Sequence, residues 1–146
     1  MQDFQNYILG AWGKGEGTET KLYNAINGDL LGGVSSAGID YEAVLTYGRN
    51  VGGPALRKMT FQERGRMLKA LAFYLLEKKS KYYKVSAWTG ATKVDSWIDI
   101  EGCIGNLFAN ASLRKQFPDL PYHIDGVAAP LSKGGSFIGH HIMVPK

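Results

Sequence analysis

The sequence has a single cysteine, Cys103, among its 146 residues. One thiol cannot form an internal disulfide or a multi-thiolate metal site, and a chain without disulfides fits a reducing compartment. Nowhere do about 18 apolar residues follow one another, and the N-terminus lacks a basic segment followed by an apolar one. We therefore expect a cytoplasmic protein with neither a signal peptide nor a membrane span.

The chain also lacks a strong excess of charge of one sign, since charged residues make up 21% of it, hydrophobic residues make up 45%, and the net charge is +4. These values are ordinary for a globular domain. The densest basic stretch, residues 78–84, interleaves lysines with aromatic residues as a nucleic-acid surface can. It holds no arginine and matches no binding motif, so a solvated junction between two helices is the better interpretation. We expect no nucleic-acid partner.

Glycine punctuates the first third of the chain. Residues 6–12 predict a short strand with a turn near Gly10. The segment at 13–17, GKGEG, is a loop and not a phosphate cradle, because Thr18 stands where a dinucleotide-binding motif has its third glycine. Asn27-Gly28 predicts a type I′ turn that joins strands over 21–26 and 30–34.

Four helices are expected after these strands. The first covers residues 40–51 and ends before Gly52-Gly53-Pro54. The second begins at a capping box formed by Thr60 and Glu63 and carries an apolar stripe as far as Leu76. The other two are a short helix capped by Ser80 that ends at Thr89-Gly90, and a long helix over 94–112.

The remainder, residues 118–136, is predicted to be a loop that leads to a terminal strand over 137–144. The fold class is therefore α+β, with N-terminal hairpins, about four helices and one terminal strand. No domain boundary is evident within the chain.

Few residues are candidates for chemistry. His140 and His141 are adjacent on the expected strand, so they point to opposite faces and cannot chelate one ion together, and His123 lies in the expected loop without a third ligand. We expect no metal site. Cys103 lies within a helix, away from its N-terminus and from cationic neighbours, and is expected to be inert.

Two carboxylates remain as a possible proton donor and acceptor. Asp95 and Asp99 are four residues apart and share one helix face. Acidic residues near a helix N-terminus are favourable without any catalytic role, which is the preferred interpretation. The residue chemistry by itself predicts no catalytic residue.

The order of motifs resembles the aldehyde dehydrogenase superfamily. Ile8-Leu9-Gly10-Ala11-Trp12, the turn at 24–29, the helix start at 59–68 and Trp88-Thr89-Gly90-Ala91-Thr92 follow one another as in its N-terminal portion. Residues 53–70, 89–108 and 130–137 are similar to one branch, the bifunctional enzymes of phenylacetic acid degradation. In that branch an NAD(P)-dependent aldehyde dehydrogenase is fused to an oxepin-CoA hydrolase with an enoyl-CoA hydratase-like domain.

The resemblance implies that residues 1–146 are the N-terminal segment of an α/β aldehyde dehydrogenase fold. Residues from about 1 to 120 would pad the cofactor domain, and residues from about 121 to 146 would begin the oligomerisation strands. The family's catalytic cysteine, asparagine and glutamate match no residue here, so we expect no catalytic and no cofactor-binding residue in this chain. NADP or NAD would belong to the full-length enzyme.

The resemblance also implies two sets of contact residues. The helix over 94–112 would border the substrate tunnel, and simple core packing remains the alternative for each of its four candidates. The tunnel candidates are Trp97, Ile98, Glu101 and Gly102. The candidates on the oligomerisation strand are Phe137, Ile138, His140, His141, Ile142 and Val144.

Two hypotheses follow. In the first, the chain is a catalytically incomplete part of an enzyme that oxidises a CoA-linked semialdehyde to the acid. In the second, it is a stand-alone, non-catalytic module for self-association or for pairing with a full-length dehydrogenase. Both predict a homo-oligomer or a complex with the rest of a dehydrogenase, because the apolar strand and helix faces require partners. The DNA after codon 146 distinguishes them.

Overall fold

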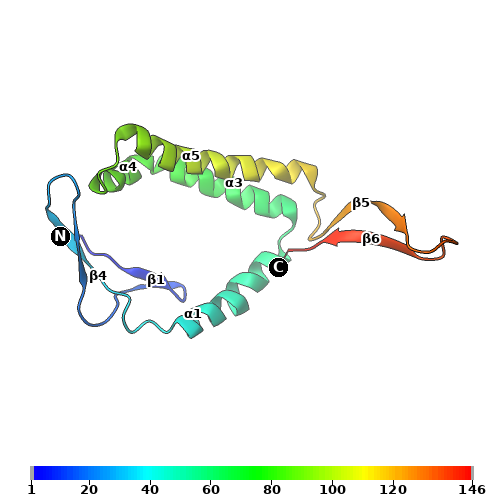
Figure 1. Ribbon diagram of the computed structural model, residues 1–146, viewed down its shortest axis with the longest axis horizontal. Coiled ribbons are helices and arrows are strands. Elements are labelled where there is room, and N and C mark those ends of the chain that lie inside the picture. The colour runs from blue at the N-terminus through cyan, green and yellow to red at the C-terminus, as the bar shows by residue number, and fades with distance from the viewer. Residues whose placement is uncertain (1, 146) are drawn as a thin grey trace.

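The computed structural model describes residues 2–145 and combines helices with short antiparallel hairpins (Figure 1). This content confirms the expected mixture of helices and strands. The strands are β1 (Asn6–Ile8), β2 (Ala11–Gly13), β3 (Thr20–Tyr23), β4 (Leu30–Val34), β5 (His123–Pro130) and β6 (Ile138–Met143). The α-helices are α1 (Tyr41–Tyr47), α2 (Gly53–Lys58), α3 (Phe61–Glu77), α4 (Lys79–Trp88) and α5 (Lys93–Ser112).

Strands β1 and β2 form the expected hairpin around Gly10. Tyr7 pairs with Trp12, and their rings lie 5.0 Å apart between centroids. Leu9 and Gly10 make the turn with positive φ angles of 52° and 82°. Glycine adopts such angles without strain, whereas leucine rarely does.

Strands β3 and β4 also pair as expected, but through a longer connection than a two-residue turn. The backbone amide of Asn24 donates to the carbonyl of Asp29 at 2.8 Å, so the loop covers the whole segment between Tyr23 and Leu30. Within this loop only Gly28 has a positive φ, of 75°, whereas a type I′ turn needs two such residues. The type I′ prediction was therefore wrong.

The first helix does not end where the sequence suggested. Asp40 caps α1 by accepting a hydrogen bond from the amide of Ala43 at 2.9 Å. The chain then continues through a π-helical turn, Gly48–Gly52, directly into α2. Pro54 lies in the first turn of α2, where its missing N–H and fixed φ are tolerated, so Gly52-Gly53-Pro54 continues the helical path.

Helices α3, α4 and α5 form one layer, in which α3 and α5 lie side by side and α4 connects them (Figure 1). Both long helices start with a capping box, Thr60 with Glu63 and Thr92 with Asp95. Helix α4 begins at Lys79 without a side-chain cap, so the prediction that Ser80 caps it was wrong. Between the long helices lie Ala72, Ile104 and Ala111, each at most 4% exposed.

Residues 123–143 form a hairpin that extends away from the helices (Figure 1). Strand β6 confirms the predicted terminal strand, but the predicted loop before it contains β5 and was wrong. Pro121, Gly126 and Pro130 concealed this strand, because proline and glycine disfavour strand interiors. The pairing is irregular between Asp125 and Ala129, where Gly126 has a φ of 74°. Such an irregularity accommodates these residues.

The chain exposes far more surface than a compact protein of its size. Its accessible surface is 10,774 Å², whereas a folded monomer of 16.0 kDa exposes about 7,400 Å². The open course of the ribbon in Figure 1 accounts for this excess. The apolar faces of the elements are therefore largely available for contact with other protein surfaces.

Candidate functional site

The N-terminus of α5 uses Asp95 for capping. The Asp95 carboxylate accepts from the Thr92 amide at 3.2 Å and from the Thr92 hydroxyl at 2.6 Å, and the Asp95 amide donates to that hydroxyl at 3.2 Å. These bonds satisfy amides that the helix leaves without partners. A structural role thus accounts for Asp95, in line with the preferred interpretation of the Asp95 and Asp99 pair.

Glu101 joins α5 to α4. Its carboxylate accepts a hydrogen bond from the Tyr83 hydroxyl at 2.9 Å and pairs with the Lys79 ammonium at 3.1 Å. The Tyr83 hydrogen bond, followed by the Lys79 hydrogen bond, lowers the pKa of Glu101 below its ordinary value. Ser86 and Ser96 make a second link between the two helices, with hydroxyl oxygens 2.8 Å apart.

The other three tunnel candidates lie on the open surface of α5. Trp97 is 56% exposed and Ile98 is 55% exposed. Gly102 is also exposed, and a Cβ there would meet no atom within 4 Å. Trp97, Ile98 and Gly102 thus form an unobstructed surface, while the Glu101 carboxylate turns to α4. Their role in a tunnel remains a prediction.

An apolar hollow of about 210 Å³ lies beside this surface. Its lining has no charged residue, so it offers nothing that would activate the exposed Cys103 thiol as a nucleophile. Sequence analysis missed this hollow. The available signal was the recurrence of Ile100, Cys103 and Ile104 at helical spacing along α5. The lining residues are Leu75, Tyr82, Ile100, Cys103 and Ile104.

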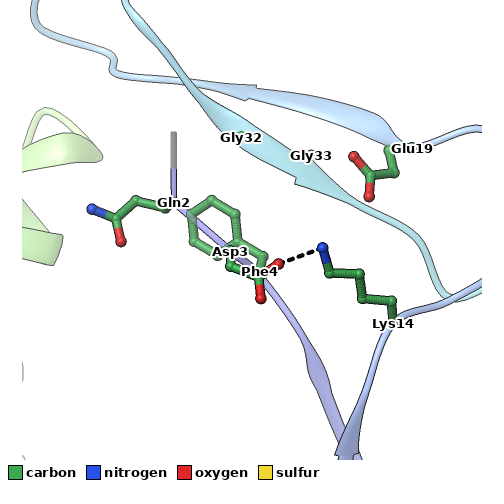
Figure 2. A pocket seen from close by; sticks show the side chains of 7 residues that line it. All are labelled: Gln2, Asp3, Phe4, Lys14, Glu19, Gly32 and Gly33. Carbon is green, nitrogen blue, oxygen red and sulfur yellow. Dashed lines mark ion pairs between the residues drawn. The ribbon is translucent and has the colours of Figure 1, made fainter.

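A second hollow, of about 260 Å³, lies where the N-terminal segment crosses β4 (Figure 2). The Lys14 ammonium pairs with the Asp3 carboxylate at 2.5 Å, and this hydrogen bond lowers the pKa of Asp3 and raises that of Lys14. The Glu19 carboxylate lies over Gly33. Sequence analysis also missed this hollow, because its residues come from separate segments.

Two of the three histidines contact a neighbouring side chain. His141 lies opposite Asp125 across β5 and β6, with its Nδ1 3.2 Å from the carboxylate, and His123 packs edge-on against Phe117 at 5.0 Å. Within residues 2–145, no three histidine, cysteine or acidic side chains gather as metal ligands. No helix in that range is long and apolar enough to cross a membrane.

The apolar candidates for the oligomerisation strand are all exposed. Phe137 and Ile138 expose 70% and 64% of their surface, and Ile142 and Val144 expose 52% and 62%. His140 and His141 are exposed beside them. Phe137 and Val144 flank β6, and the other four residues belong to it. The structure therefore brings these residues together on one hairpin.

No family model matches the chain. A search of characterised proteins found a similarity to the 3,4-dehydroadipyl-CoA semialdehyde dehydrogenase of Aromatoleum evansii. The two are 33% identical over 141 residues, which make up 96% of this chain. The chain spans 27% of the length of that dehydrogenase. The chain is thus similar, over nearly all of its own length, to a minor part of an aldehyde dehydrogenase that acts on a CoA-linked semialdehyde.

Proposed function

We propose that this chain is the N-terminal part of an NAD(P)-dependent aldehyde dehydrogenase of phenylacetic acid degradation. That enzyme oxidises a CoA-linked semialdehyde to the acid. The observation that carries the proposal is the 33% identity, over 96% of the chain, to a 3,4-dehydroadipyl-CoA semialdehyde dehydrogenase. The exposed apolar surface of the helices and hairpin supports it, because such surface requires partner elements.

In this proposal the chain supplies support and substrate contact, and the remainder of the enzyme supplies the chemistry. Oxidation of an aldehyde by a nicotinamide enzyme needs an activated nucleophile and a bound dinucleotide. Within residues 2–145 the sheets are two-stranded and antiparallel, whereas a dinucleotide fold needs parallel strands joined by helices. We therefore expect the nicotinamide site in the remainder of the enzyme, and no catalytic step is assigned to the residues described here.

The contribution to substrate binding is assigned to the open surface of α5. Trp97 and Ile98 offer apolar side chains, and Gly102 leaves space for a bulky thioester tail. Glu101 belongs to the same segment, and its bonds to Tyr83 and Lys79 hold α5 in place. In this view Glu101 is a positioning residue for the tunnel wall.

The β5–β6 hairpin is assigned to assembly. Both outer edges of this two-stranded sheet are unpaired within the described chain, and exposed strand edges pair readily with other strands. Phe137, Ile138, Ile142 and Val144 add apolar area. A homo-oligomer in which this hairpin meets a second subunit would cover them.

Kinetic measurements on the protein from the complete open reading frame test the proposal. We expect it to reduce NADP or NAD with 3,4-dehydroadipyl-CoA semialdehyde, and we expect no reduction by the purified 146-residue chain. Gly102→Leu should raise KM for the CoA-linked aldehyde, whereas Ala70→Leu, which adds the same side chain to an exposed position of α3, should not. Equal effects of the two changes, or turnover by the short chain, would contradict the assignment of roles.

A second candidate is a stand-alone, non-catalytic module that self-associates or pairs with a full-length dehydrogenase. The specific observation in its favour is the accessible surface, which exceeds that of a compact monomer by about 3,400 Å². An area of this size is enough for a stable interface. Co-purification of the native polypeptide from its source cells decides between the two. A 16 kDa species bound to a separate dehydrogenase would favour the module, and a single longer polypeptide would exclude it.

A further inference from the structure

A pocket of about 300 Å³ lies between the N-terminal segment and α4, away from the surfaces assigned above. We call it the α4 pocket. Its volume is at the lower end of the range typical of small-molecule sites. Its lining includes two aromatic residues and two lysines and contains no acidic residue. The lining residues are Gln2, Phe4, Lys81, Lys84, Val85 and Trp88.

Two backbone hydrogen bonds hold the walls of the α4 pocket together. The Gln2 amide donates to the Leu31 carbonyl at 2.7 Å and fixes the N-terminal segment on β4. The Ala25 amide donates to the Trp88 carbonyl at 2.8 Å and ties the end of α4 to the loop after β3. Segments distant in sequence therefore meet to form the pocket.

Phe4 is positioned by its contact with β4. A Cβ on Gly32 would lie 3.0 Å from two ring carbons of Phe4, so the ring rests directly on the glycine (Figure 2). Phe4 also lines the α4 pocket with Val85 and Trp88. An aromatic wall held between a strand and a helix is suited to stacking against a planar ring.

Lys81 and Lys84 supply the positive charge of the α4 pocket. They are three residues apart on α4 and therefore lie on the same face. Within the described chain neither makes an ion pair, whereas the neighbouring Lys78 and Lys79 pair with Glu77 and Glu101. Two lysines that line one pocket without carboxylate partners favour a phosphorylated ligand.

An adjoining apolar hollow of about 260 Å³ extends the site. It shares Phe4, Val85 and Trp88 with the α4 pocket, and its other lining residues are Leu22, Tyr23, Ala25, Leu31 and Thr89. The pair of hollows thus offers a largely apolar, aromatic compartment next to a basic one. A ligand that combines a flat base with phosphate matches both compartments.

We propose that the α4 pocket and this adjoining hollow bind a phosphorylated adenosine. The base lies against Phe4 and Trp88, and the ribose phosphate is held by Lys81 and Lys84. We assign the adenosine 3′-phosphate of CoA as its source. That assignment rests on the proposed CoA-linked substrate, whereas binding of a phosphorylated adenosine rests on the pocket alone. The 2′-phosphoadenosine of NADP has related chemistry and is the competing source of such a ligand.

Isothermal titration calorimetry of the 146-residue chain with adenosine 3′,5′-bisphosphate tests the site. We expect saturable binding that weakens as the salt concentration rises. Because each lysine provides a charge-assisted bond, the double variant Lys81→Gln/Lys84→Gln should bind about tenfold or more weakly. The control variant Lys58→Gln/Lys115→Gln removes the same charge from exposed positions outside the pocket and should bind like the original chain.

The absence of binding, or equal losses in the two double variants, would overturn the proposal. Far-ultraviolet circular dichroism shows whether each variant keeps its helices. Titrations with CoA, 3′-dephospho-CoA and NADP identify the source of the ligand. Tighter binding of CoA than of the other two supports the CoA assignment, and a preference for NADP overturns it. These are binding measurements on the chain itself, so their failure is distinct from a failure of the dehydrogenase assay.

Discussion

Replacing Gly65 with alanine is expected to destabilise the layer of α3 and α5. A Cβ at this position would lie 2.5 Å from Cδ and 2.7 Å from Cβ of Arg114, and 3.0 Å from the carbonyl oxygen of Ala111. Arg114 cannot move aside freely, because its guanidinium donates to the Ala111 carbonyl at 2.8 Å. The two helices must therefore separate locally or Arg114 must change rotamer.

The magnitude follows from two opposing effects. Overpacking of this kind costs about 1–3 kcal/mol. Alanine in place of glycine within a helix stabilises it by about 1 kcal/mol. The net loss of unfolding free energy should therefore be about 1 kcal/mol, and up to about 2 kcal/mol where Arg114 cannot relax.

Gly102→Ala is the matched control. Gly102 also lies inside a long helix, but a Cβ there meets nothing within 4 Å. Only the gain in helix propensity remains, so this variant should be more stable by about 0.5–1 kcal/mol. Urea unfolding followed by circular dichroism at 222 nm measures both changes. If Gly65→Ala stabilised the chain as much as Gly102→Ala, the close approach of α3 to Arg114 would be refuted.

Four further variants test the α5 cap, the core, the hydrogen bonds of Glu101 and the assembly role of the hairpin. Thr92→Ala should lower the unfolding free energy by about 1 kcal/mol through loss of the capping box, whereas Thr89→Ala, outside the box, should cost less in the same urea experiment. Ile104→Ala should cost about 2–5 kcal/mol, and a cost typical of an exposed site would show that Ile104 is not part of the core. Glu101 has a pKa below its ordinary 4.5. The stability that its charged carboxylate gives the folded chain is therefore complete above pH 4.5 and is lost as the pH falls through the lowered pKa. Glu101→Gln should thus destabilise the chain at pH 7 and make its stability less dependent on pH below 4.5; an unchanged acid profile would contradict the hydrogen bonds to Tyr83 and Lys79. Light scattering should show a dimer or larger oligomer that Ile142→Asp dissociates, and a monomer at high concentration of the original chain would refute the assembly role of the hairpin.

Local sequence signals predicted the parts of the fold that depend on neighbouring residues. The capping box at Thr60 and the apolar stripe after it predicted α3, and the apolar residues between Phe137 and Val144 predicted β6. Both signals act within a few residues, so no distant contact is needed to interpret them. The pairing of β1 with β2 around Gly10 is of the same kind.

The sequence predictions were wrong where tertiary contacts overrode the local preference of a segment. The Gly52-Gly53-Pro54 segment has the composition of a helix end, but the π-helical turn carries the chain through it. Strand β5 contains glycine and ends in proline, and it forms because β6 offers a partner for it. In both cases the chain follows pairing or packing that its own residues disfavour.

The sequence by itself determined the start of helix α3 and the position of the terminal strand β6, because a capping box and a short run of apolar residues are short-range signals. Only the tertiary structure decided that Glu101 faces α4, that Gly65 must remain small, and that Phe4 and Trp88 line one pocket with Lys81 and Lys84. Each of these three features depends on the distance between two elements, and the spacing of residues along the sequence does not specify that distance.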